Sequence, residues 1–212
     1  MKQFFLLGVF VVLAVFAMDG CIFDPDKDPP GTGDGDYKPL TSPENVMNNL
    51  VVSYRRREIQ KYAEFLDKEF IFRFQDGDEP PELGREFWTH DEDSTGTEAL
   101  FNSPSVSDIS VDLTYGAAEE AEELGMEGTM KIRVTPMKLT VDDVDGTTFL
   151  VEGDIQDMFF RNGEGADSTS WTLIEWRDSP GAGGVGAPGV HTLAEDGNVV
   201  HVSWGELLGL RR

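Results

Sequence analysis

Residues 130–159 read MKIRVTPMKLTVDDVDGTTFLVEGDIQDMF, and this stretch does most to decide the fold. Apolar and polar side chains alternate along both halves of it, which is the period of a half-buried β-strand. Asp145-Gly146, between the halves, is a typical two-residue hairpin turn. We expect a bulge at Pro136, because proline cannot donate to a β-ladder. The stretch therefore predicts a long antiparallel hairpin.

The return strand of this hairpin is expected to have one apolar face and one solvated face. The apolar face should carry Phe149, Val151, Ile155 and Phe159. The solvated outer face should carry Glu152, Asp154 and Gln156.

Helices are expected before the hairpin. Ser42-Pro43-Glu44 offers a hydroxyl cap, a proline at the first helical position and an acid in the first turn. Arg55-Arg56-Arg57 is interpreted as a solvated junction, after which Ile59 begins a second helical stripe. Thr89-His90-Asp91-Glu92 has the pattern of a capping box, so a third helix is expected from there to Phe101.

Further strands surround these helices. Phe70-Ile71-Phe72-Arg73-Phe74 alternates with period two and places three phenylalanines on one side. Residues 109–115 alternate in the same way. Residues 171–176 and 199–204 are the last two strands expected. The chain is therefore predicted to be α+β, with its helices mostly at the start.

The first 21 residues resemble a bacterial lipoprotein signal. Lys2 supplies a short basic region, and residues 4–18 are apolar but fall short of the roughly 20 residues that a spanning helix needs. A glycine and then Cys21, the only cysteine, follow at once. We expect residues 1–20 to be a signal peptide and Cys21 to be acylated. The alternatives are an ordinary secretory peptide cut after Ala17 and an uncleaved anchor.

Composition divides the rest of the chain into a tether and one domain. Residues 21–40 are rich in Pro, Gly and Asp and predict a disordered tether, which leaves 41–212 as one domain. The chain has 17 basic and 40 acidic residues, a net charge of -23, which disfavours nucleic acid as a partner. We expect an exported protein anchored to a bacterial membrane, on its periplasmic or surface side.

The order of these elements resembles the nuclear transport factor 2-like superfamily, which includes SnoaL-like proteins, ketosteroid isomerase and scytalone dehydratase. The residues that carry the resemblance are Ser42-Pro43-Glu44-Asn45 leading to Leu50 and Tyr54, residues 62–65 before Phe70-Ile71-Phe72, Phe87-Trp88, residues 171–178 and Ser203-Trp204-Gly205. The chain is especially similar to lipoproteins of unknown function in that superfamily. The resemblance covers residues 41–212 and implies a cone-shaped fold, with a curved, mostly antiparallel sheet packed on the N-terminal helices.

The resemblance also implies an apolar cavity at the wide end of the cone, which in this superfamily serves as an enzyme site or as a dock. Such a cavity suits a small apolar molecule. The candidate wall residues are Tyr54, Tyr62, Phe70, Phe72, Phe74, Trp88, Tyr115, Trp171 and Trp176. The alternative for the phenylalanines and tryptophans among them is an ordinary position in the core. Asp157 is the one candidate for a catalytic base, and an exposed carboxylate near a strand end is its ordinary interpretation.

No cofactor or metal is expected. Residues 181–186 read GAGGVG and match a dinucleotide fingerprint, but no helix follows to receive a pyrophosphate. His90, His191 and His201 are the only histidines, and no pair has the spacing of metal ligands.

Three hypotheses about function follow. The first is a lipid-anchored, non-catalytic module that binds an apolar ligand or an envelope protein in the cone cavity. The second is an isomerase-like or dehydratase-like enzyme, which requires Asp157 and a tyrosine to meet inside the cavity. The third is a structural or assembly protein that forms a homodimer through its exposed sheet face.

Overall fold

The computed structural model describes residues 36–74, 84–153, 155–163, 169–179, 199–202 and 204–209. All of them belong to one unit of the chain, Gly35–Arg212. The predicted signal, Cys21, most of the predicted tether and the Gly-rich stretch at 181–186 lie outside the described residues.

The first two helices begin where the sequence predicts, at Pro43 and Ile59. In α2 (Pro43–Arg56), the Ser42 hydroxyl accepts a hydrogen bond from the Asn45 N–H at 3.3 Å. The helix ends at Arg57, whose backbone is left-handed with φ 56°. α3 (Ile59–Glu64) follows directly, so the predicted arginine-rich junction between two helices is confirmed.

Two further helices lie later in the chain. α4 (His90–Asn102) starts with the predicted capping box, in which the Thr89 N–H donates to Glu92 Oε2 at 2.9 Å. A short C-terminal helix, α5 (Trp204–Gly209), contacts α4 and the sheet. No helix in the described part of the chain combines the length and apolar character that crossing a membrane requires.

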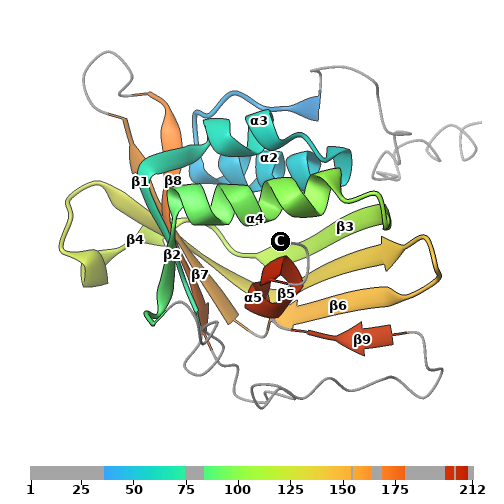
Figure 1. The fold of residues 1–212 in the computed structure, drawn as a ribbon. Helices are drawn as coiled ribbons and strands as arrows, with labels where there is room; N and C mark the ends of the chain where they lie inside the picture. The colour runs from blue at the N-terminus through green and yellow to red at the C-terminus, as the bar shows by residue number, and fades with distance from the viewer. Residues whose placement is uncertain are drawn as a thin grey trace, which may run out of the picture. The chain divides into compact units, whose positions relative to one another are not determined.

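The described strands form one mixed sheet. They are β1 (Leu66–Arg73), β2 (Phe87–Thr89), β3 (Val106–Tyr115), β4 (Glu119–Glu120), β5 (Thr129–Asp143), β6 (Thr148–Gly153), β7 (Ile155–Asn162), β8 (Trp171–Ser179) and β9 (Val199–His201). The order is β2-β1-β8-β7-β5-β6-β9, and β3 and β4 also pair with β5. All pairs are antiparallel except β1–β8 and β6–β9. Figure 1 shows the sheet curving beneath α2, α3 and α4, so the predicted α+β architecture is confirmed.

The long strand β5 contains one extra residue near its middle. Its pairing with β3 moves from Leu113 opposite Met137 to Tyr115 opposite Val134, which is two residues on β3 against three on β5. This confirms the bulge predicted at Pro136. Because side chains alternate with period two, one extra residue reverses the face on which the following side chains lie.

This reversal overturns the predicted faces of the return strand. Val151 of β6 lies on the inner face, as expected, but Gln156 of β7 pairs with Val134 and is also on the inner face, 4% exposed. Its neighbour Asp157 and also Phe159 therefore point outward. The prediction was wrong because it assumed unbroken alternation, whereas the chain changes phase between β6 and β7.

The main core lies between the inner face of the sheet and the helices. Its largest fully buried side chains include Tyr54, Tyr62, Phe65, Phe70, Phe72, Trp88, Leu100, Phe160 and Trp176. A second, smaller cluster lies on the outer face, where Ala121 and Leu124 pack against Phe159 and Ile174. The segment with β4 and the 3₁₀ turn Glu122–Leu124 thus covers Phe159, which explains why an outward-facing phenylalanine is buried.

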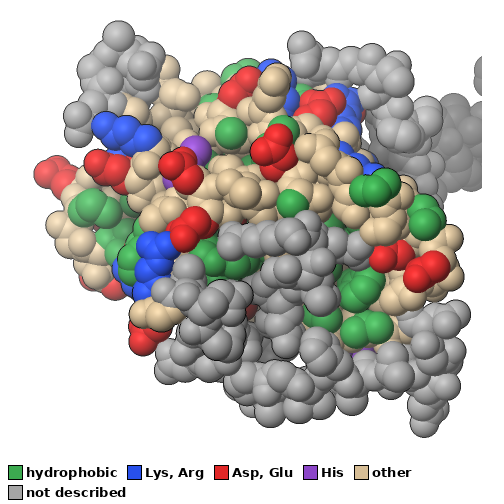
Figure 2. Space-filling view, viewed as in Figure 1, with side chains coloured by type: hydrophobic (Ala, Val, Ile, Leu, Met, Phe, Trp, Pro, Cys, Tyr) green, Lys and Arg blue, Asp and Glu red, His purple; other side chains and the backbone are tan. Residues whose placement is uncertain are grey.

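Residues 36–40, which we expected in the tether, are held on α2. The Lys38 N–H donates to Asn49 Oδ1 at 2.8 Å, and Asn49 Nδ2 donates back to the Lys38 carbonyl at 2.8 Å. Asp36 forms an ion pair with Arg56. Figure 2 shows acidic side chains spread over the viewed face rather than gathered in one patch.

Neighbouring residues on opposite faces of β5 test the register of the sheet. Leu139 is fully buried, so Leu139→Ala should lower the free energy of unfolding by about 2–5 kcal/mol. Lys138 is exposed and forms an ion pair with Glu152 at 3.9 Å. Lys138→Ala should therefore change the free energy of unfolding by less than about 0.5 kcal/mol. Urea denaturation of the full-length variants measures both. Similar losses in the two variants would contradict the register.

Candidate functional site

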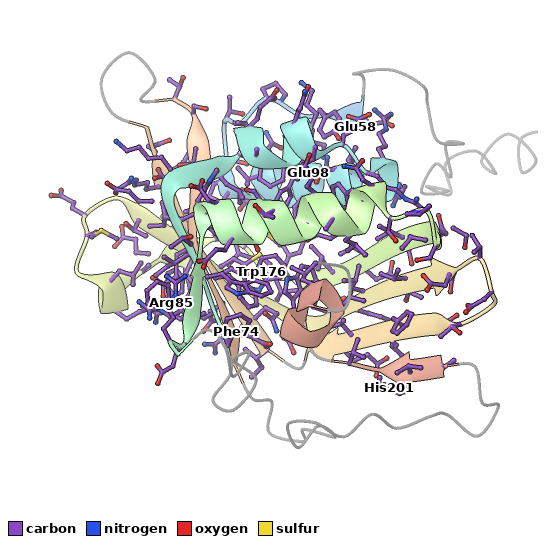
Figure 3. The ribbon with its side chains drawn as sticks, viewed as in Figure 1. Glu58, Phe74, Arg85, Glu98, Trp176 and His201 are labelled. Carbon is purple, nitrogen blue, oxygen red and sulfur yellow. The ribbon has the colours of Figure 1, made fainter. Side chains whose placement is uncertain are left out.

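The inner face of the sheet carries a layer of aromatic rings. Phe72 of β1 is paired with Trp176 of β8, and their ring centroids lie 5.5 Å apart. Phe74 and Trp88 extend the layer with an edge-to-face contact at 4.8 Å. Figure 3 shows Trp176 beneath α4 and Phe74 further down the same side of the sheet. This layer follows from the period-two sequence of β1, which places its phenylalanines on one side.

The C-terminal helix α5 covers this layer. Trp204 packs against three rings from three different elements: Trp176 at 4.9 Å, Tyr54 at 5.6 Å and Phe72 at 6.3 Å between centroids. Leu207 is also fully buried. Figure 1 shows α5 below α4, against the inner side of the sheet. The chain's own last helix therefore covers this part of the interior.

A cluster of buried polar side chains lies under α4. The Tyr62 hydroxyl donates to Asp93 Oδ2 at 2.6 Å, and the Tyr54 hydroxyl lies 3.4 Å from Thr97 Oγ1. All four side chains are fully buried. Burial first, and then the charge of Asp93, raises the pKa of both tyrosines well above the usual range. Both hydroxyls therefore remain protonated at neutral pH and act as neutral hydrogen-bonding groups.

A second polar group orients Trp176. Its Nε1–H donates to Gln156 Oε1 at 2.5 Å, and Gln156 Nε2 in turn donates to Asp178. The amide fixes the rotation of the indole ring, because a buried Trp N–H needs an acceptor. The interior thus combines rigid aromatic surface with a few fixed polar groups, which is the make-up of a site for an apolar molecule.

Most of the predicted wall residues are brought together in the interior. Those that are buried there are Tyr54, Tyr62, Phe70, Phe72, Phe74, Trp88 and Trp176. Tyr115 is 37% exposed at the end of β3, and Trp171 is half-buried at the start of β8. Trp171 still packs against the main core. The role of the whole set as cavity walls stays a prediction.

Asp157 lies on the outer face of the sheet. Arg133 donates to both carboxylate oxygens, from Nε to Oδ1 at 2.8 Å and from a terminal nitrogen to Oδ2 at 2.9 Å. The enzyme hypothesis required Asp157 to meet a tyrosine inside the cavity, whereas Tyr54 and Tyr62 lie on the other side of the sheet. The neighbouring Glu175 is likewise held on the outer face by arginines.

Four residues of the interior were not predicted as site residues from the sequence: Asp93, Thr97, Gln156 and Trp204. A helical reading of α4 could have found the first two, because Asp93 and Thr97 share a face with Leu100 at spacings of four and three residues. Gln156 was assigned to the wrong face. Trp204 was noted only as part of the resemblance.

Among the described residues, no group of three or more His, Cys, Asp or Glu side chains is arranged to hold a metal ion. His90 lies beside Asp91 at 3.1 Å, and His201 is on β9. His191 and the Gly-rich stretch lie outside the described residues.

Comparisons with known proteins give similar structures but no similar sequences. No protein-family model matches the chain, and no curated protein is significantly similar to it. The chain is similar to the structure of a conserved protein from Planctomyces limnophilus, with 15% identity, a TM-score of 0.49 and coverage of 64% of this chain and 91% of that one.

Two further solved structures are similar to the chain. One is an NTF2-like protein of unknown function in nutrient uptake from Rhodospirillum rubrum, with 14% identity, a TM-score of 0.45 and coverage of 65% and 97%. The other is a hexachlorocyclohexane dehydrochlorinase from Novosphingobium barchaimii, with 11% identity, a TM-score of 0.44 and coverage of 63% and 80%.

The buried tyrosines predict how stability depends on alkaline pH. The pKa of Tyr62 is raised in the folded protein from 10.0, so the unfolded chain loses this proton first as the pH rises. Its stabilising contribution is therefore complete below pH 10 and declines above it, by about 1.4 kcal/mol per pH unit. Tyr62→Phe should remove the share that Tyr62 contributes to the slope of the unfolding free energy against pH. Urea denaturation between roughly pH 10 and 11.5 measures this slope.

Tyr115→Phe is the matched control, because Tyr115 is partly exposed and should contribute a smaller slope. If Tyr62→Phe leaves the slope as steep as in the wild type, Tyr62 does not stay protonated in the folded protein.

Proposed function

We propose that this chain is a lipid-anchored module of the bacterial envelope that binds an apolar molecule in its interior and does not convert it. The observation that carries the proposal is the aromatic layer of Tyr54, Phe72 and Trp176, which surrounds Trp204. Aromatic rings at these separations present a large apolar surface that suits flat apolar groups.

The non-catalytic part of the proposal is supported by the positions of the carboxylates. Asp157 is bound by Arg133 on the outer face. Asp93, in the interior, already accepts a hydrogen bond from Tyr62. General acid–base catalysis needs groups that are free to reach a substrate proton. Here Asp157 is held by Arg133, and Asp93 is held by Tyr62. The second pair joins α3 to α4 and fixes their packing.

An enzyme is the second candidate, and the same Asp93 is the observation that favours it. A carboxylate that is fully buried and accepts a hydrogen bond from a tyrosine resembles the buried acid–base groups of active sites. In that case Asp93, and not Asp157, is the base. A bound molecule would then be recovered in altered form after incubation with the wild type, and unaltered after incubation with Asp93→Asn.

The assembly alternative needs an apolar surface for a partner subunit. In the described part of the chain, the large apolar side chains that are exposed are Tyr115, Met126 and Val144. They lie on separate segments: the end of β3, the turn after residue 124 and the β5–β6 turn. A homodimer therefore remains the least supported of the three functions.

The lipid anchor is tested by Cys21→Ala in the full-length chain, expressed in a bacterium that processes lipoproteins. We expect the wild type in the membrane fraction with an acylated N-terminal cysteine, and the variant without acyl mass and largely released. Mass spectrometry of the N-terminal peptide identifies the processing site. A variant that remains in the membrane would contradict acylation and support an uncleaved anchor.

The ligand is tested by native mass spectrometry of the full-length chain, purified from its membrane in a mild detergent. We expect a reproducible extra mass from a small apolar molecule, one per chain. A clean monomer without extra mass would contradict the binding function, and a clean dimer would favour the assembly alternative.

A further inference from the structure

Trp204 is held in a box of aromatic rings that fits a flat, fused-ring group. The ring of Phe72 is nearly parallel to the indole, at an interplanar angle of 22°, and those of Trp176 and Tyr54 are tilted by 48° and 53°. The three rings come from β1, β8 and α2. Stacked and tilted contacts of this kind favour an aromatic guest over an aliphatic one of equal area.

The helix that carries Trp204 is too short to be stable in isolation. α5 (Trp204–Gly209) has six residues, and isolated helices shorter than about 12 residues are marginal in water. The side chains known to fix it are Trp204, Leu207 and Leu208, all buried. It contacts α4 and β6, and through Trp204 it also contacts rings of α2, β1 and β8. The position of α5 therefore depends mainly on how well Trp204 and the two leucines fit their surroundings.

Trp204 is an imperfect occupant of its box. Its side chain is 2% exposed, yet its Nε1–H has no hydrogen-bond partner in the described structure. The neighbouring Trp176 shows the usual arrangement, with its Nε1–H donating to Gln156. A buried donor without an acceptor costs free energy that a guest without an N–H avoids.

We propose that the aromatic box around Trp204 is the ligand site, and that its ligand is a flat, fused-ring aromatic molecule without a buried donor, which enters as Trp204 leaves. The inference rests on the proposed binding function and specifies its ligand class. The ligand replaces an indole of similar size, so Tyr54, Phe72 and Trp176 keep their positions. In the free protein the Trp204 side chain occupies the site. Only molecules from which Trp204 has left can bind the ligand, so the apparent affinity for the ligand falls in proportion to that fraction.

The test uses naphthalene as the probe and the full-length chain labelled with 5-fluorotryptophan. The four tryptophans give separate fluorine NMR signals, and Trp204→Phe assigns the signal of Trp204. We expect naphthalene to move the Trp204 signal to a solvent-exposed position, where a water-soluble paramagnetic agent broadens it. The Trp176 signal should shift through the new ring but stay protected, and the Trp171 signal should stay unchanged.

Two variants measure the competition directly. Trp204→Ala empties the box and should bind naphthalene at least about tenfold more tightly than the wild type. Trp171→Ala is the matched control: it removes a half-buried tryptophan that makes none of the ring contacts of Trp204, and it should bind within about twofold of the wild type. All variants are measured in the same detergent, so partitioning of the probe is common to them.

The proposal is overturned if naphthalene binds while Trp204 stays protected, or if neither the wild type nor Trp204→Ala binds it. If Trp204→Ala does not fold, the fluorine measurement on the wild type decides alone. A copurified apolar ligand that leaves Trp204 protected would overturn this inference but leave the binding function intact. Absence of any ligand in both experiments would remove the binding function as well.

Discussion

The constraint on which the structure depends is the burial of the aromatic inner face of β1 and β8. Phe72 and Trp176 are neighbours across a parallel strand pair and both are fully buried. A curved sheet with this much aromatic surface on its inner side must be covered from end to end, because exposed apolar area is unfavourable in water. α2 and α4 cover one part of it, and α5 covers another.

That division gives adjacent parts of the interior different characters. Under α4 the core is tied by polar contacts, with Tyr62 donating to Asp93 and Tyr54 beside Thr97. Under α5 the contacts are rings and leucines, and Trp204 contributes a donor with no partner in the described structure. Buried polar contacts fix one arrangement, whereas apolar contacts tolerate the exchange of one flat group for another. The exchangeable part of the interior is therefore the part that α5 covers.

The sequence predicted local features well and the relation between distant ones less well. The Ser42 cap, the capping box at Thr89 and the phenylalanine face of β1 follow from spacing over a few residues, and all three are confirmed. Gln156 and Asp157 were assigned to the wrong faces, because the phase of β7 depends on how it pairs with β5 beyond its bulge. The packing contacts of Trp204 could not be predicted, since the three rings that it touches come from three separate elements.

The central claim, that α5 leaves its seat without unfolding the rest of the protein, is tested most directly by amide hydrogen exchange of the full-length chain. We expect the α5 amides of Leu207 and Leu208 to exchange by local opening, at a free energy well below that of the α4 amides of Leu100 and Phe101. Exchange of both helices at the free energy of global unfolding would contradict it, because Trp204 would then be a permanent part of the core.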